Sequence, residues 1–550
     1  MSLLSQSITA NLFDLSTFNF ISFAFLIGVL YLVWHYRDGR AIGTRRRTDL
    51  YSPRGQQTFL LGDVIGLIKN QDRAMERFME AKRVERRPEE KGKALSFTAP
   101  YGRRMIEISS PHMLEYVQKT NFQNYVKGPL FYKNLSGLLG DGIFVVDGAQ
   151  WQAQRKATSK IFTANNFKGV ISQSIDTNMN KLMTIIGRHA DTGTTFDLSE
   201  LFFRFTLSSF SEMAFGSNFG ALSTETDEPV PFAKAFDYAQ VVMNRRFTNP
   251  FWQVTEWLDG TRAKMIAANK VMDDFAFAVI KEREEMGRGN FTGAQKKDAA
   301  DKDLLSLYMA LRDENGQPMN RKALRDALMN LLIAGRDTTA QALSWTFFRL
   351  ILHPEELITP IRKEVDEVGQ VDYDSYKTCV QTLAALQEGL RLHPSVPKNA
   401  WQAVGDDQIP NGPRIEAGDQ VFWSDFVMGR DQTVWGDDAT QFRPSRWIEE
   451  DGNLRKESQF KAHYFNGGYR QSVQTLCHPI YYSSMNLALY EGVSVLAAII
   501  REFDLSFAPG YLENTSMLDM EFTPRYAGAL TLSMAAPFSV RAVRRKSSLK

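Results

Sequence analysis

The chain has 550 residues, and its content of 43% hydrophobic and 23% charged residues is close to the globular average, which argues against a disordered protein. Its formal net charge of +2 gives no indication of a nucleic-acid partner. Only two cysteines occur, Cys379 and Cys477, so a disulfide framework is excluded and a reducing compartment is expected.

The first predicted element is a membrane-spanning helix near the N-terminus. An apolar run from Phe18 to Trp34 contains no charged residue, and as a helix it would be roughly 26 Å long, against about 30 Å of bilayer hydrocarbon. No lysine or arginine precedes this run, whereas arginines follow it from Arg37 onward. The asymmetry predicts an uncleaved signal anchor over residues 1–36, with the membrane-spanning part at about 12–34 and the rest of the chain in the cytosol.

The body of the protein is predicted to follow a basic linker and hinge at residues 37–56 and to occupy residues 57–550. Up to about Leu392 the apolar residues recur with helical spacing, including one long candidate helix without proline at about 320–352. A polar, glycine-containing stretch at 282–303 is predicted to be an exposed connector.

Two later stretches lack this helical spacing. Prolines and glycines divide residues 396–419, and similarly the tail at 504–540, into short strands and turns. The expected fold class is therefore mainly α with minor β, as a single large domain behind an N-terminal transmembrane helix.

Trp151 and Arg155 are the first candidate site residues along the chain. They stand four residues apart in a helical stretch, so an indole N–H and a guanidinium can reach the same anionic group. An exposed Trp/Arg stack without a ligand is the simpler alternative.

The segment Ala334-Gly-Arg-Asp-Thr-Thr339 lies inside the long candidate helix. Glycine and threonine are poor helix formers, and their cost in a helix interior suggests a functional reason. A local widening of the helix would free backbone groups for a ligand or water, and Asp337 and Thr338 would then be placed to pass protons. Threonines that only bond back to a carbonyl of their own helix are the alternative.

Glu388 and Arg391 stand one helical turn apart and are expected to form an ion pair. Further along, Phe442-Arg-Pro-Ser-Arg-Trp447 contains a second arginine, Arg446, that would complete a buried ion network around the same carboxylate.

The order of these stretches along the chain is more specific than any one of them. Together with the loop Phe465-Asn-Gly-Gly-Tyr-Arg470, the set resembles the cytochrome P-450 superfamily of haem-thiolate monooxygenases over essentially all of residues 57–545. By this resemblance, Asp337 and Thr338 are the acid and the alcohol that deliver protons during oxygen activation. Glu388, Arg391 and Arg446 are, by the same resemblance, the structural triad behind the haem.

The resemblance also implies a haem b cofactor, with electrons that come from NADPH through a separate reductase. Trp151, Arg155 and Arg470 look like the donors to the haem propionates. Phe465 should pack beside the sulfur that binds the iron.

Two positions depart from the family pattern. Four residues after Pro397, where relatives often carry a basic partner of a propionate, this chain has Trp401, which leaves Lys398 as a displaced substitute. The family's iron-binding cysteine belongs two residues after the arginine of the loop, but Ser472 stands there and Cys477 comes five residues later.

The disrupted loop allows three interpretations. Fourteen residues, 471–484, stand where the pattern needs four, before a helix like that of the family resumes at Met485. In the first interpretation a loop that folds back brings Cys477 to the iron. In the second, Ser472 faces the iron and the protein is inactive. In the third, the stretch is a translated intron or a misplaced exon boundary.

At the level of function, the resemblance implies a monooxygenase anchored in the endoplasmic-reticulum membrane with a cytosolic catalytic domain. Residues 334–345 look most like the fatty-acid omega-hydroxylase branch, which suggests a long-chain fatty acid or an alkane as substrate. The expected partners are an NADPH-cytochrome reductase, the lipid bilayer and an apolar small molecule. The alternatives are a haem-thiolate isomerase or dehydratase, against which Asp337 and Thr338 argue, and a membrane-anchored haem-binding protein without turnover.

Overall fold

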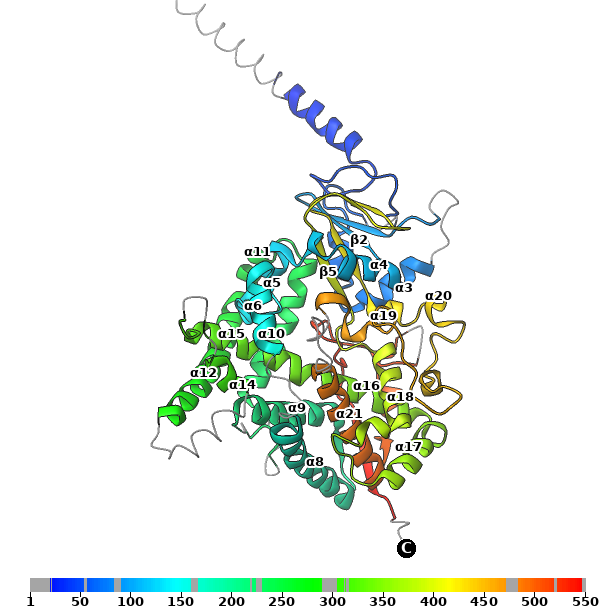
Figure 1. Ribbon diagram of the computed structural model, residues 1–550. Coiled ribbons are helices and arrows are strands. Elements are labelled where there is room, and N and C mark those ends of the chain that lie inside the picture. The colour runs from blue at the N-terminus through cyan, green and yellow to red at the C-terminus, as the bar shows by residue number, and fades with distance from the viewer. Residues whose placement is uncertain are drawn as a thin grey trace, which may run out of the picture.

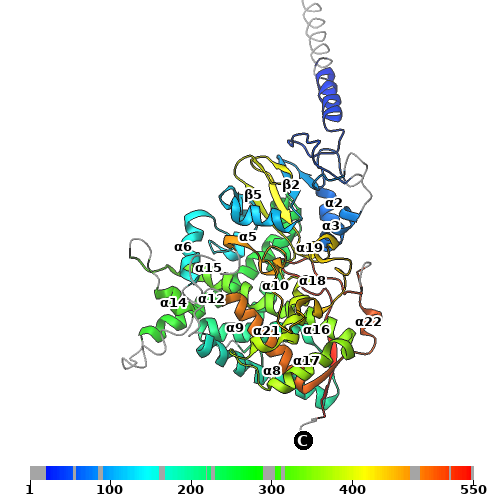
Figure 2. The same ribbon diagram turned by 45° about the vertical axis from the view of Figure 1, so that its right-hand side comes forward.

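The computed structural model describes residues 22–53, 57–83, 91–159, 167–217, 220–223, 230–288, 304–310, 316–470, 483–518 and 522–546, together with Phe20 and Arg312. A β-rich end lies next to the N-terminal helix and joins a larger helical part (Figures 1 and 2). Helices α8 (Ser172–Thr192) and α17 (Pro354–Val368) lie at the opposite end.

The β-rich end is a five-stranded sheet with the strand order β1-β2-β8-β5-β3. Its strands are β1 (Ser96–Ala99), β2 (Arg103–Glu107), β3 (Tyr125–Val126), β5 (Asn399–Ala403) and β8 (Gln420–Trp423). Only the pairing of β2 with β8 is parallel within this sheet. The sheet therefore joins two stretches of sequence that are some three hundred residues apart, ~100 and ~410 in the numbering of the chain.

Alternate residues of the sheet enter different apolar clusters. Trp401 and Val421 are paired across β5 and β8 and belong to one cluster, while the neighbouring pair, Ala400 and Phe422, belongs to another. This is the two-residue alternation expected of a strand that is covered on both faces. Short helices near the sheet are α2 (Val64–Lys69), α3 (Ala74–Arg83), α4 (Pro111–Glu115) and α19 (Asp425–Met428).

The helical part buries the main apolar core of the described residues. Apart from α8, α17 and the long helix described below, its helices are α5 (Gly128–Leu139), α6 (Gly148–Ser159), α9 (Leu198–Phe215), α10 (Pro231–Thr248), α11 (Trp252–Leu258), α12 (Thr261–Arg288), α14 (Leu304–Ala310), α18 (Val380–Leu392) and α21 (Ser483–Glu502). Helix α9 has a sequence signal at each end. Asp197 caps its first turn by accepting from the backbone N–H groups of Ser199 and Glu200, and Gly216 ends it in the left-handed conformation.

The long candidate helix at 320–352 is interrupted by a wider turn. It consists of α15 (Arg321–Leu332), the π-helical turn η6 (Ile333–Asp337) and α16 (Thr338–Leu352). The local widening expected from the glycine and threonines is therefore confirmed. Gly335 is required there, because a Cβ atom at this position would collide with the ring of Phe210 on α9.

The predicted connector at 282–303 needs a correction. Helix α12 continues as far as Arg288, so the first seven residues of that stretch are helical, and residues 289–303 lie outside the described part of the chain. Glu284 explains part of this, since it pairs with Arg321 and so ties the end of α12 to the start of α15.

The remaining strands fall in the two stretches expected to contain them. A pair of two-residue strands, β6 (Asp407–Gln408) and β7 (Arg414–Ile415), lies in 396–419. A three-stranded sheet in the order β4-β10-β9 joins β4 (Thr195–Asp197), β10 (Ser539–Arg544) and β9 (Phe503–Phe507). The fold is mainly helical with minor strands, as expected.

The N-terminal helix of the described residues, 22–35, projects away from the body (Figures 1 and 2). Its large apolar side chains are exposed, with Phe23 at 61% and Trp34 at 61%. Part of the predicted anchor, up to residue 19, lies outside the described residues. Across the ranges that the structure does describe, no helix combines the length and the apolar character needed to cross a membrane.

Candidate active site

A cavity of about 510 Å³ lies between the sheet and the helical part. One wall comes from η6 and α16, and others come from α18, the start of α21, α6 and the stretch around Phe465. Most of the side chains in these walls are apolar. Four of the sequence-predicted site residues, which come from three distant stretches of the chain, border this cavity: Trp151, Arg155, Thr338 and Phe465.

The π-helical turn brings its backbone and Thr338 to the cavity. Ala334, Gly335 and Thr338 all line it, and the Thr338 hydroxyl donates to the carbonyl oxygen of Ala334 at 2.7 Å. This is the back-bonding expected of a helical threonine, so in this state the hydroxyl is committed to its own helix.

Asp337 is buried but does not border the cavity; its polar partners come from its neighbour Arg336 and from α10. Gln240 of α10 donates to Asp337 Oδ2 at 2.5 Å, and Arg336 Nη1 lies 3.1 Å from Oδ1. Burial raises the pKa of Asp337 to about 6, even though the positive charge of Arg336 opposes that change. Asp337 is therefore a carboxyl group that can change its protonation state near neutral pH.

Arg336 extends this cluster to the surface. Its Nη1 also pairs with Oδ1 of Asp237, on α10, at 2.6 Å, and 55% of the Asp237 side chain is exposed. The guanidinium is itself buried and lies over the rings of Phe203 and Phe236. A polar path thus runs from solvent at Asp237, through Arg336, to Asp337.

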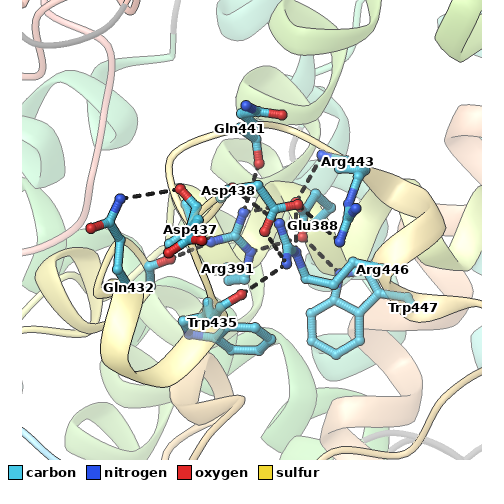
Figure 3. Close-up of polar contacts among 12 residues, drawn as sticks. Glu388, Arg391, Gln432, Trp435, Asp437, Asp438, Gln441, Arg443, Arg446 and Trp447 are labelled. Atoms are coloured by element: carbon cyan, nitrogen blue, oxygen red, sulfur yellow. Dashed lines mark hydrogen bonds and ion pairs between the residues drawn. The ribbon is translucent and has the colours of Figure 1, made fainter.

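Glu388 is the centre of a second buried ion cluster (Figure 3). Arg391 donates to it twice, from Nη2 to Oε1 at 2.7 Å and from Nε to Oε2 at 2.8 Å, while Arg446 Nε lies 3.4 Å from Oε1. The indole N–H of Trp447 and the backbone N–H of Arg443 complete the set at 2.9 and 2.8 Å.

The same arginines also hold the chain between residues 429 and 441 in place. Arg391 donates to the carbonyl oxygens of Gly429, Ala439 and Gln441, and Arg446 pairs with Asp438 at 2.9 Å (Figure 3). Glu388 does not border the cavity, but Leu386 and Leu390 on the same helix do. The cluster therefore fixes a cavity wall from behind.

Trp151 and Arg155 lie on α6, one turn apart, and both border the cavity. The Trp151 ring packs against Phe122 with centroids 5.7 Å apart. Burial lowers the pKa of Arg155 to about 10, which marks a cation largely withdrawn from water. Such a guanidinium favours an anionic group as neighbour.

The loop after Phe465 is described only in part. Phe465 borders the cavity and packs against Tyr464 with centroids 5.2 Å apart. The backbone of Arg470 ends the short helix η10 (Gly468–Arg470), but its side chain, together with Ser472 and Cys477, lies outside the described residues.

Sequence reasoning missed several members of the site. Glu491 on α21 borders the cavity and accepts from the Ser209 hydroxyl at 2.5 Å, and burial raises its pKa to about 7. Its only signal in the sequence was a charged residue within the mostly apolar stretch 487–500. Asp237 and Gln240 gave no signal at all, because only packing brings α10 against η6.

Comparison with known proteins adds an independent finding. A family model described as Cytochrome P450 matches residues 64–473 and so ends inside the stretch 471–484. The chain is 39% identical to the Cytochrome P450 monooxygenase cyp1 of Mycosarcoma maydis over 536 residues, which cover 94% of this chain and 79% of that protein.

Plant proteins match at lower identity. Cytochrome P450 86B1 of Arabidopsis thaliana is 35% identical over 73% of this chain and 72% of its own length. The alkane hydroxylase MAH1 of the same plant is 30% identical over 76% of this chain and 82% of its own length.

Proposed function

The chain belongs to the cytochrome P450 family, and on that basis we propose that it is a membrane-anchored haem monooxygenase that hydroxylates a long-chain fatty acid or an alkane. The observation that carries the proposal is the apolar cavity bordered together by Trp151, Arg155, Thr338 and Phe465. A haem bound there supplies the oxygen-activating chemistry of the family.

The residues along the cavity suit a haem. The group is flat, apolar on both faces and anionic at one edge. Ala334 and Phe465 offer apolar surface, and Trp151 and Arg155 offer an N–H donor and a desolvated cation for the anionic edge. Arg470 would be the third donor to that edge, on the strength of its place in the sequence.

Asp337 and Thr338 are the proposed route for protons into the cavity. The raised pKa of Asp337 lets this carboxyl group take up and release a proton near neutral pH. Thr338 borders the cavity one residue further on, so its hydroxyl would pass the proton when it releases the Ala334 carbonyl. Gln240 and Arg336 hold the carboxylate in place, and Asp237 connects it to solvent.

The triad Glu388, Arg391 and Arg446 has a positioning role in this proposal. By tying α18 to the chain around Asp438, it would keep the loop that leads to the iron ligand in register with the cavity.

An apolar substrate agrees with the cavity walls and with the relatives, one of which is named an alkane hydroxylase. The exposed apolar side chains of the helix at 22–35 favour an anchor in the endoplasmic-reticulum membrane, with the body in the cytosol. Electrons would then come from NADPH through a membrane-bound reductase.

The iron ligand is proposed to be Cys477, because Cys379 is buried in the helical core and is the only other cysteine. The second candidate function is a haem-binding protein without turnover, which the serine at position 472 favours. The absorption spectrum of the reduced, carbon-monoxide-bound full-length chain separates the two.

We expect a thiolate-type Soret band that disappears in Cys477→Ala and persists in the matched variant Cys379→Ala. Hydroxylation of a fatty acid with reductase and NADPH should be lost in parallel with the band. A haem spectrum without the thiolate band in the unaltered chain would instead establish the second candidate, and failure to bind haem would reject both.

A further inference from the structure

Lys398 is the cation of the cavity wall that the proposed haem site leaves unused. Within the described part of the chain, its ammonium group has no hydrogen-bond or ion-pair partner. The other wall cations are engaged: Arg77 Nη1 pairs with Glu80 at 3.0 Å, Lys127 donates to backbone carbonyl oxygens at 2.6 and 3.4 Å, and Arg155 has a partner too.

The acidic residues of the wall are held by other groups. Asp63 accepts from the backbone N–H of Thr98 at 2.7 Å, and Asp425 lies 2.6 Å from the ring of His463. Glu491 accepts from the Ser209 hydroxyl. Burial lowers the pKa of Lys398 to about 8, and no acidic side chain among the described residues opposes that change. At pH 7 the amine is still mostly charged, so its charge has no counter-charge within the part of the chain that the structure describes.

Lys398 directly precedes β5, whose first residue is Asn399. Lys398, Ala400 and Trp401 all border the cavity. Within the strand, Ala400 packs against the cluster with Phe78, Phe97 and Phe422, whereas Trp401 belongs to the other cluster.

Several aromatic side chains border the cavity near β5. Trp401 meets Phe122 edge-on at 6.2 Å, and Phe122 in turn packs on Trp151. Phe78 and Phe97 also border the cavity. An apolar compartment with one unpaired cation is the arrangement that an apolar anion requires.

We propose that Lys398 binds the carboxylate of the substrate, so that the cavity selects free fatty acids over alkanes and esters of the same length. The proposal rests on the proposed function and narrows its substrate class. A carboxylate would receive a charge-assisted hydrogen bond in a desolvated wall. An alkane or ester would leave the buried ammonium unpaired, and sites built to bond a polar group reject analogues that lack it.

The test compares hexadecanoic acid with its methyl ester. Binding of each to the full-length chain in phospholipid nanodiscs is measured by quenching of tryptophan emission, for the unaltered chain, Lys398→Met, Lys398→Arg and the matched control Lys264→Met. Lys264 is exposed on α12. The haem affinity of each variant is measured in parallel by absorbance, because a haem propionate offers the same carboxylate chemistry.

We expect the unaltered chain to prefer the acid roughly 10- to 100-fold, the range of one hydrogen bond to a charged group. Lys398→Met should bring the two affinities to within about threefold, while Lys398→Arg and Lys264→Met keep the preference and haem affinity stays unchanged.

A preference that survives in Lys398→Met would overturn the proposal. So would a loss of haem affinity in that variant with the preference intact, which would assign Lys398 to a propionate. Failure of the proposed function looks different, since then neither the acid nor the ester would bind to the unaltered chain.

Discussion

The two buried ion clusters, around Glu388 and around Asp337, use the same chemistry for different ends. Glu388 receives five donors, and its arginine partners also donate to backbone carbonyl groups, so the charges are bound on all sides within the protein. Asp337 has two side-chain donors, one of which leads to an exposed carboxylate, and its pKa is raised to about 6.

The contrast teaches how a buried charge is kept or released. A carboxylate whose lone pairs are all occupied by donors holds chain segments in register. A carboxyl group that is buried but less fully satisfied can accept a proton instead of a counter-charge. Glu388, of the first kind, lies behind the cavity wall, and Asp337, of the second kind, is the last residue of the π-helical turn.

The largest effect should come from removing the carboxylate at the centre of the Glu388 cluster. Glu388→Ala leaves two buried guanidinium groups without their counter-charge, and we expect a loss of about 3–5 kcal/mol in the free energy of unfolding, measured by urea denaturation at pH 7. Lys270→Ala removes an exposed ion pair with Asp274 on α12 and should change the midpoint little. Equal losses in both variants would remove the distinction between buried and exposed pairs.

Glu491→Gln tests a buried carboxyl group that has no cationic partner among the described residues. The pKa of Glu491 rises from 4.5 to about 7, so the folded chain keeps a proton that the unfolded chain releases, and stability falls as pH increases through that window. The unaltered chain should therefore lose about 3 kcal/mol between pH 4.5 and 7 on account of this residue. In the glutamine variant that loss should be absent, as denaturation curves at several pH values would show; parallel pH profiles would contradict the prediction.

Arg336→Met tests the ion cluster around Asp337. Without the guanidinium the pKa of Asp337 should rise further, and the folded chain would keep its proton to a higher pH. We expect a loss of about 2 kcal/mol near pH 8 that shrinks toward pH 5, where Asp337 is protonated in both proteins. The measurement is thermal unfolding at the two pH values, and a loss independent of pH would assign Arg336 a purely structural role.

Much of the fold was predictable because its signals are local. The helical spacing, the break at 396–419 and the poor helix formers at 334–339 are properties of short windows, and the pairing of Glu388 with Arg391 follows from one helical turn. What failed depends on long-range packing. Gln240 reaches Asp337, and Asp237 reaches Arg336, only because α10 packs against this turn. Asp438 joins the triad only through the path of a loop.

The strand β5 is a further example. The sequence does not show which apolar cluster each of its residues contacts, and only the pairing of β5 with β8 places Trp401 in one cluster and Ala400 against another.

The π-helical turn can also be regarded as a single-residue insertion preserved within a helix. The wider turn accommodates the extra residue, so deleting one residue within 333–336 would let the turn close into regular α-helix while α16 keeps nearly its present orientation. Each residue of an α-helix turns it by about 100°, so a deletion early in α16 itself would rotate the rest of that helix and move its buried face away from α9 and α18. The π-helical turn is therefore a place where this helix can lose a residue without turning the segment that follows.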